Sequence, residues 1–177
     1  MKPFGVLSVK DRDGNLLEEN RAEPSDVIRA DTAFVMTNLL RGVLLHGTAR
    51  SAAGMASQWP LAGKTGTVDD NTDAWFIGFD PDITVGVWVG LDEKKSMGSQ
   101  EQGALAALPI WVDFMKAYLD GREDKDDPPT FEAPGNIVFL AVDQLNGAVL
   151  SSEAPGSINE AFISGTQPGA NSFNRQP

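Results

Sequence analysis

The chain has 177 residues, a formal net charge of −11 and 41% hydrophobic residues. Nucleic acids and anionic lipids are bound by clustered lysine and arginine side chains, so this acidic balance argues against both as partners. The sequence has no cysteine, which excludes disulfides and thiolate metal sites, and no apolar run approaches the ~20 residues that cross a bilayer. This length suits one domain with a modest core and a small appendage.

The first part of the sequence predicts a β-hairpin and then a helix. Residues 4–10 and 15–18 flank the segment 11–14, in which an aspartate can close a turn and Gly14 can take a positive φ. Apolar residues recur at three- and four-residue spacing between Asp31 and His46. We therefore expect a helix over that range, capped by Asp31 and ended by Gly47.

The middle of the sequence predicts a sheet. Residues 48–58 are small and polar, which is typical of a loop or a short helical turn before the strand that carries Lys64. Residues 73–79 and 83–90 are strand-like and apolar on both faces. We expect these two strands at the centre of a sheet that is covered on both sides.

The last part predicts a helix, a linker and a second hairpin. Residues 104–119 have the apolar density of a helix packed on the sheet, with Pro109 in its first turn or at a kink. Residues 136–142 and 148–150 flank a turn and predict a small hairpin. The residues from Gly165 onwards are rich in Gly, Pro, Ser and Asn, which predicts disorder.

Single residues elsewhere carry weaker signals. His46 is the only histidine, and without a nearby acidic ligand pattern we interpret it as a helix-end residue. Asp69, Asp70 and Asp73 are interpreted as a solvated loop instead of a metal cluster, with Asp73 fixing the entry to the next strand. Three tryptophans are expected in the core, and a fourth is expected near a cleft; they are Trp75, Trp88 and Trp111, and Trp59.

The segment Gly63-Lys64-Thr65 invites a nucleotide-binding interpretation. A phosphate-binding P-loop requires a glycine five positions before Gly63, where this chain has Gln58. Pro60 removes a backbone N–H from the loop that would hold phosphate, and no helix pattern follows Thr65. The P-loop interpretation is therefore disfavoured.

A site that binds a carboxylate accounts for the segment better. On an extended edge strand, Lys64 and Gly66 face one way and Thr65 and Thr67 the other. The lysine raises the positive potential, the threonine hydroxyls can hydrogen-bond a carboxylate, and Gly66 allows a ligand to approach closely. The alternative for these residues alone is a structural edge strand with a solvated lysine.

The longer context of this strand resembles a known family. The stretch 61–91, LAGKTGTVDDNTDAWFIGFDPDITVGVWVGL, is similar to the third active-site motif and following strands of class A penicillin-binding proteins, bifunctional glycosyltransferase and transpeptidase enzymes. Segments 11–15, 32–49 and 106–119 are similar to the hairpin, helix and C-terminal helix of the same transpeptidase domain. The resemblance covers about residues 4–120 and implies an α/β (α+β) fold, with an antiparallel sheet and flanking helices.

The resemblance also implies how the chain is divided. Residues 1–120 correspond to the C-terminal portion of a transpeptidase domain, 121–134 to an acidic proline-containing linker, and 135–177 to a small C-terminal extension. In the family the first strands of the sheet come from upstream sequence. The resemblance therefore implies an incomplete domain, whose missing N-terminal part would be a partner of this chain.

The family's motif assigns roles to the KTGT residues. Lys64 would shape the field of the cleft and contact the serine of an SxN motif. Thr65, Gly66 and Thr67 would bind the carboxylate end of a peptidoglycan stem peptide or a β-lactam, and the backbone N–H of Thr67 would supply half of an oxyanion hole. The resemblance implies no metal and no cofactor.

The family's nucleophile, the serine of an SxxK turn, has no counterpart here, because no serine of the chain is followed three residues later by lysine. Ser157-Ile-Asn159 and Ser172-Phe-Asn174 have the SxN pattern. Both lie after KTGT, whereas SxN precedes it in the family, so we interpret both as accidental.

The expected function is part of a peptidoglycan D,D-transpeptidase, which binds penicillin and cross-links stem peptides through an acyl-serine intermediate. The isolated chain is predicted to be inactive. We expect periplasmic or other extracytoplasmic action, with the parent protein anchored in the inner membrane by an N-terminal segment absent here. The alternative is a non-catalytic binding or assembly module that retains the KTGT strand. A related β-lactamase or carboxypeptidase fits segments 32–49 and 106–119 less well.

Overall fold

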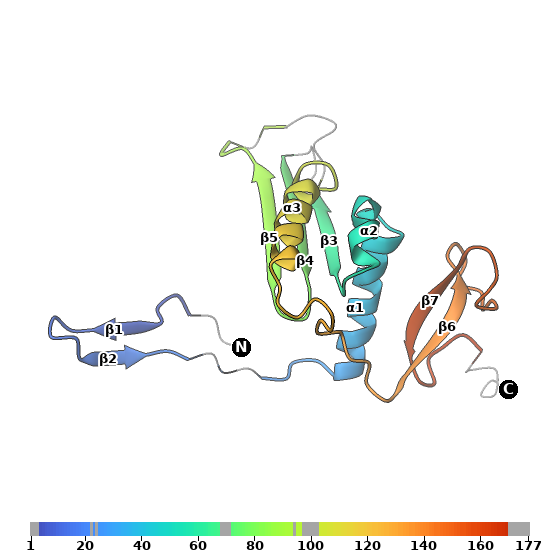
Figure 1. Cartoon of the computed structure of the whole chain (residues 1–177), viewed down its shortest axis with the longest axis horizontal. Helices are drawn as coiled ribbons and strands as arrows, with labels where there is room; N and C mark the ends of the chain where they lie inside the picture. Colours follow the sequence, from blue (N-terminus) through green and yellow to red (C-terminus); the bar gives the residue numbers. More distant parts are fainter. Residues whose placement is uncertain are drawn as a thin grey trace.

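The structure is a computed structural model that describes residues 4–21, 23, 25–67, 72–93, 95–96 and 103–169. Its three sheets are a hairpin β1-β2, a three-stranded sheet β3-β4-β5 and a hairpin β6-β7. Figure 1 shows the three-stranded sheet in the middle, with one hairpin at each end. The predicted mixed α/β class, with antiparallel sheets and helices, is confirmed.

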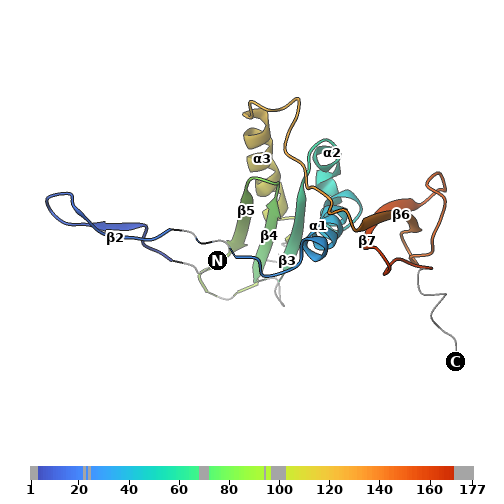
Figure 2. The same ribbon diagram turned by 90° about the horizontal axis from the view of Figure 1, so that it is seen from below.

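The predicted N-terminal hairpin is present. Strand β1 (Ser8–Lys10) pairs antiparallel with β2 (Leu16–Glu19). The turn is closed as expected, because the Asp11 carboxylate accepts hydrogen bonds from the backbone N–H groups of Asp13 at 2.9 Å and Asn15 at 2.8 Å. Both strands are exposed, and the hairpin extends away from the sheet and helices in both views (Figures 1 and 2).

The central sheet contains β3 (Ala62–Thr67), β4 (Asp73–Phe79) and β5 (Thr84–Gly90), with β4 in the middle. Because side chains alternate along a strand, β4 has a buried face and an open face. Phe76 is fully buried, whereas its neighbours Trp75 and Ile77 are 41% and 47% exposed. The expectation that both faces are covered is therefore wrong for this chain: β5 is an edge strand, and Trp88 on the open face is 46% exposed.

Helix α3 (Ala107–Asp120) covers the buried face of the sheet and begins three residues later than predicted. Pro109 is in its first turn, where a missing N–H leaves no intrahelical bond unmade. Trp111 is fully buried and packs against Phe76, with ring centroids 4.9 Å apart and the ring planes tilted by 59°. A Cβ at Gly78 would lie 2.4 Å from the Trp111 ring, so only glycine permits this approach.

Helix α1 (Ala30–Leu45) differs from its prediction at the first turn. Arg29 is the N-cap residue and makes no side-chain cap, so the expectation that Asp31 caps the helix is wrong. Asp31 lies inside the first turn instead, where its carboxylate pairs with the Arg29 guanidinium and accepts a 2.7 Å hydrogen bond from the Asn136 side chain. These two partners, Arg29 first, lower the pKa of Asp31 to about 2.

The short helical turn predicted after α1 is present as η1 (Arg50–Ala52) and α2 (Ala53–Ala56). Its small side chains allow close packing between α1, α3 and the sheet. Twelve buried residues form a hydrophobic core that joins these elements. They are Leu44, Ala49, Ala52, Ala56, Leu61, Ala74, Phe76, Ala107, Leu108, Trp111, Met115 and Leu119.

The chain that leaves α3 is fixed by a group of charges around Arg122, whose side chain is 10% exposed. The guanidinium donates to the carboxylates of Asp124 at 2.6 Å and Asp82 at 2.8 Å, and to the Tyr118 hydroxyl at 2.6 Å. Asp80, in the turn between β4 and β5, lies 3.5 Å away. These hydrogen bonds, with Asp124 the largest contributor, raise the pKa of Arg122.

The C-terminal hairpin differs from its prediction. Strand β6 (Ile137–Asp143) pairs along its whole length with β7 (Ser157–Ile163), which the prediction missed. The predicted partner is also present in part, because the Asp143 N–H donates to the Ala148 carbonyl at 2.8 Å and the Leu150 N–H donates to the Ala141 carbonyl at 2.9 Å. Only an isolated bridge joins Val149 to Val142. The predicted turn is real, because the Asp143 carboxylate accepts from two following backbone N–H groups at 2.8 Å and 3.0 Å. Val142 pairs with both Ile158 of β7 and Val149, so the two partners lie on opposite edges of β6.

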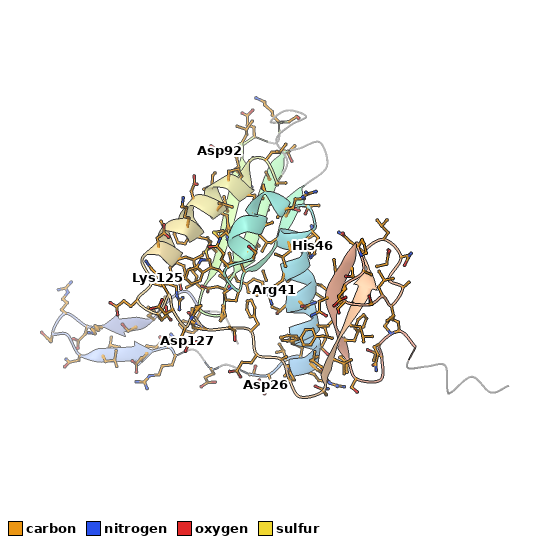
Figure 3. The ribbon with its side chains drawn as sticks, turned by 45° about the vertical axis from the view of Figure 1, so that its right-hand side comes forward. Asp26, Arg41, His46, Asp92, Lys125 and Asp127 are labelled. Atoms are coloured by element: carbon orange, nitrogen blue, oxygen red, sulfur yellow. The ribbon has the colours of Figure 1, made fainter. Side chains whose placement is uncertain are left out.

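The β6-β7 hairpin packs on α1, on the side away from β3 (Figure 2). Phe34 meets Phe139 edge to face at 6.0 Å, and the Asn38 amide donates to Glu160 at 2.9 Å. Burial raises the pKa of Glu160, partly offset by that hydrogen bond. In Figure 3, α1 lies between the central sheet and this hairpin and carries the labelled Arg41 and His46.

Disorder from Gly165 onwards stays a prediction, and the first residues of that segment are described as a turn. Gly165 has φ 90° and its N–H donates to the Gln167 side chain at 2.7 Å, so residues 165–169 form a turn. The rest of the segment, residues 170–177, lies outside the described part of the chain.

Candidate substrate-binding strand

The KTGT residues lie on β3, an edge strand that pairs with β4 alone. Lys64 is opposite Ile77, and Gly66 is opposite Trp75. Residues opposite each other in a sheet point to the same face, so Lys64 lies on the open face with these exposed apolar side chains. Thr65 is opposite the buried Phe76 and points to the helix-covered face. The predicted alternation of Lys64 and Thr65 is confirmed.

The polar groups of this strand form a connected set. The Lys64 ammonium is exposed and donates to the Thr65 carbonyl at 2.9 Å and to the Thr65 hydroxyl at 3.2 Å. The Thr65 hydroxyl is also 3.1 Å from the hydroxyl of Thr48, which follows α1. A cation and two hydroxyl groups therefore meet at the strand's edge, an arrangement that can receive an anion.

Glycines allow the backbone around these groups to pack closely. A Cβ at Gly63 would lie 2.8 Å from the Phe76 ring. A Cβ at Gly66 would lie 3.2 Å from the Cβ of Trp75, and one at Gly103 would lie 2.8 Å from the Gly66 carbonyl oxygen. Gly63 and Gly103 thus allow β3 to pack closely against its neighbours. Gly66 has no side chain, so a ligand can approach the open face of the strand beside Trp75.

The P-loop interpretation does not survive in the structure. Gly63, Lys64 and Thr65 are inside a β-strand with a regular antiparallel register, and the strand continues to Thr67. A phosphate-binding loop instead turns back to open a helix. The Thr67 backbone pairs with Ala74, and its side chain lies outside the described part of the chain.

Three aspartates follow the KTGT strand, and the structure describes one of them. Asp73 fixes the entry to β4, because its carboxylate accepts from the Thr72 hydroxyl and the Trp88 indole, each at 2.8 Å. Asp69 and Asp70 lie outside the described residues. Among the described residues, no group of three or more His, Cys, Asp or Glu side chains could hold a metal ion.

His46 is the C-cap residue of α1, as predicted (Figure 3). Of the three tryptophans expected in the core, only Trp111 is buried, while Trp75 and Trp88 stand on the open face. Trp59, expected near a cleft, packs against the core beside α2 and α3. Ser157 of the first SxN pattern donates to the Ser152 carbonyl at 3.2 Å, and the second pattern, at 172–174, is outside the described residues.

Thr48 was not predicted as a site residue. It is separated from Thr65 by 17 positions, and its contact depends on how the end of α1 packs beside β3. No spacing rule links two threonines across a helix end and a strand. The only local signal is the glycine that precedes Thr48, which indicates a tight turn.

Comparison with known proteins places these features in one family. The family described as "Penicillin binding protein transpeptidase domain" matches residues 1–116. The chain belongs to this transpeptidase domain family, which confirms the resemblance drawn from the sequence. No helix in the described ranges is long and apolar enough to cross a membrane.

Two similar proteins are penicillin-binding proteins of one type. Penicillin-binding protein 1A of Aquifex aeolicus is 40% identical over 94% of this chain and 22% of its own length. Penicillin-binding protein 1A of Pseudomonas aeruginosa is 39% identical over 77% of this chain and 16% of its own length. This chain therefore spans about a fifth of the curated relatives it matches.

A solved structure gives the same fold. The crystal structure of penicillin-binding protein 1A from Haemophilus influenzae matches with a TM-score of 0.69 and 24% identity, over 94% of this chain and 30% of that chain. At this identity the match supports the fold alone. It reaches beyond the 116 residues of the family match.

Proposed function

We propose that this chain supplies the substrate-binding strand of a peptidoglycan D,D-transpeptidase. The observation that carries the proposal is the Lys64-Thr65 edge of β3, where an exposed ammonium and a hydroxyl lie together on a strand with one unpaired side. The ligand would be the terminal carboxylate of a stem peptide or of a β-lactam. Family membership supports that ligand, because relatives carry the name penicillin-binding protein.

In this proposal the residues divide the work between charge and geometry. Lys64 makes the cleft positive, Thr65 and Thr67 donate to the carboxylate, and Gly66 lets the ligand lie against the strand. The backbone N–H of Thr67 donates to the oxyanion that develops when a serine attacks the D-Ala-D-Ala carbonyl. The attacking serine belongs to an SxxK turn, a pattern that no serine of these 177 residues has.

The proposal includes an organisation and a location. Residues 1–120 form the C-terminal portion of the transpeptidase domain, 121–134 a linker, and 135–177 an extension. An upstream part of the domain completes the sheet and provides the nucleophile. The reaction takes place outside the inner membrane, where peptidoglycan is cross-linked, and the parent protein is anchored there by a preceding segment.

The second candidate is a binding or assembly module without catalysis. The exposed side chains of Trp75, Ile77 and Trp88 favour this candidate, because a contiguous apolar surface can bind a partner protein. The two candidates differ in one measurable property, which is acylation when an SxxK half is supplied.

A chimera tests this difference. Residues 1–120 would replace the matching segment of the Aquifex aeolicus relative, and acylation would be followed with a fluorescent penicillin. We expect labelling of the chimera and none of the 177-residue chain alone. Lys64→Ala and Thr67→Val should each slow labelling by about 10² to 10³, the usual effect of removing a preorganised donor.

The control is Thr84→Val, which removes an exposed hydroxyl at the start of β5. This variant of the chimera should be labelled at the parent rate. Circular dichroism establishes that each variant is folded. Equal labelling rates for the Lys64 and Thr67 variants and the parent chimera would remove the role of this strand. A folded chimera that takes no label would favour the binding module.

A further inference from the structure

The turn after α1 places Thr48 beside the KTGT strand, and the backbone on both sides of Thr48 has little conformational freedom. The Gly47 N–H donates to the Gly42 carbonyl at 3.0 Å, and the Ala49 N–H donates to the Val43 carbonyl at 3.1 Å. A Cβ at Gly47 would lie 2.9 Å from the Val43 backbone, so this turn requires glycine. Ala49 is fully buried in the core. Thr48 is therefore held on both sides by fixed neighbours.

The hydroxyl of Thr65 has one proton and two lone pairs, and its neighbours decide where the proton points. The Lys64 ammonium can only donate, so its 3.2 Å contact uses one lone pair of Thr65. The Thr48 hydroxyl is 3.1 Å away and can donate to the second lone pair. With both lone pairs occupied, the Thr65 proton remains free to donate to an external acceptor.

We propose that Thr48 is a positioning residue for carboxylate recognition: it donates to Thr65, fixes its side-chain rotamer, and turns its hydroxyl proton outward to the ligand. This inference rests on the proposed function for the identity of the ligand. Thr48 itself touches no substrate in this arrangement, and it acts through Thr65. A hydroxyl at position 48 is the chemical requirement, so serine satisfies it and valine does not.

The first experiment needs no ligand. In the labelled 177-residue chain, three-bond NMR couplings to the Thr65 methyl carbon report its χ1 angle. We expect one staggered rotamer in the parent chain and in Thr48→Ser, and averaged couplings in Thr48→Val. Thr84→Val is the control for loss of a hydroxyl elsewhere and should match the parent chain. If Thr48→Val does not fold, Thr48→Ala removes the same hydroxyl without adding a branched methyl group.

The second experiment measures how tightly the 177-residue chain and its variants bind two peptides. They are diacetyl-L-Lys-D-Ala-D-Ala and the same peptide with a C-terminal amide. We expect the acid to bind more tightly than the amide, and Thr48→Val to raise the Kd of the acid roughly 3- to 10-fold, the usual range for one hydrogen bond. Thr48→Ser should restore the parent Kd. The amide should bind all variants equally.

The two experiments separate the possible failures. Equal affinity for acid and amide in the parent chain would refute carboxylate recognition, while the Thr65 couplings would still decide whether Thr48 positions Thr65. A single unchanged Thr65 rotamer in Thr48→Val, or an unchanged Kd for the acid alongside a clear acid-to-amide preference, would overturn the role of Thr48.

Discussion

The two faces of the central sheet are made from the same strands but have different surroundings. On one face Phe76 and Trp111 are fully buried under α3. On the other, no helix of the described residues covers Trp75, Ile77 and Trp88, which remain between 41% and 47% exposed. Lys64 stands on the open face, and Thr65 points to the covered one. The proposed site at the edge of β3 thus combines a side chain from each face of the sheet.

The largest expected difference between the faces is in core packing. Phe76→Ala should lower the free energy of unfolding by about 3–5 kcal/mol, because it removes a buried ring and leaves a cavity beside Trp111. Ile77→Ala, one residue along β4 but on the open face, should lower it by less than about 1 kcal/mol. Urea unfolding measures both values, and similar losses at the two positions would contradict the assignment of faces.

Gly78 on the covered face and Gly86 on the open face test the same difference between the two faces of the sheet. An alanine Cβ at position 78 would lie 2.4 Å from the Trp111 ring, whereas one at position 86 would lie 3.8 Å from Ile77, an ordinary contact. Gly78→Ala should therefore cost about 1–3 kcal/mol by overpacking. Gly86→Ala should be neutral or slightly stabilising, since alanine restricts the unfolded chain. Thermal unfolding of the two variants would show the difference, and equal melting temperatures would count against it.

The open face should also drive self-association of the 177-residue chain. Exposed Trp75, Ile77 and Trp88 lie together beside the unpaired edge of β5, and contiguous apolar surface of this kind promotes association. Ile77→Glu should raise the dissociation constant about tenfold, equivalent to ~1.4 kcal/mol. Leu145→Glu, on the distant hairpin, should leave it unchanged. Analytical ultracentrifugation decides, and a monomeric parent chain at micromolar concentration would refute the prediction.

The smallest expected effect is a pH dependence on the side of α1 away from the sheet. Asp31 has a pKa lowered to about 2 by Arg29 and then Asn136, so its contribution to stability is complete above the unfolded value of ~3.9. That contribution is lost as the pH falls from about 4 to about 2. Asp31→Asn should make the denaturation midpoint less dependent on pH in this range, and Asn136→Ala should reduce that dependence in part. An unchanged acid limb in Asp31→Asn would contradict this account.

Local patterns were enough to predict the elements that shape the site. The turn at Asp11, the periodicity of α1, the strand at Lys64 and the position of Pro109 all depend on neighbouring residues, and each has its expected place. The family resemblance added the expected role of β3 in binding a carboxylate and the antiparallel order of the strands. The mixed α/β class followed from the same segments.

Features that depend on distant residues were predicted less well. Trp75 and Trp88 have core-like chemistry, but their exposure is decided by which face α3 covers. The pairing of β6 with β7 spans an intervening loop that has its own short bridge at Val149, so the nearer partner was predicted. Asp31 finds Asn136 across 105 positions, which no capping rule includes. Thr48 was missed for the same reason.

The charges around Arg122 have a mechanical consequence. The chain that runs from α3 to the β6-β7 hairpin is held first at Arg122, where partly buried charges are screened little by salt, and then at α1 through Asn136 and Glu160. A force that pulls on the C-terminal end reaches the contacts with α1 before it reaches Arg122. The hairpin would peel from α1 while the guanidinium still holds the turn at Asp82. Tension on the extension therefore loads α1 before it loads the turn between β4 and β5.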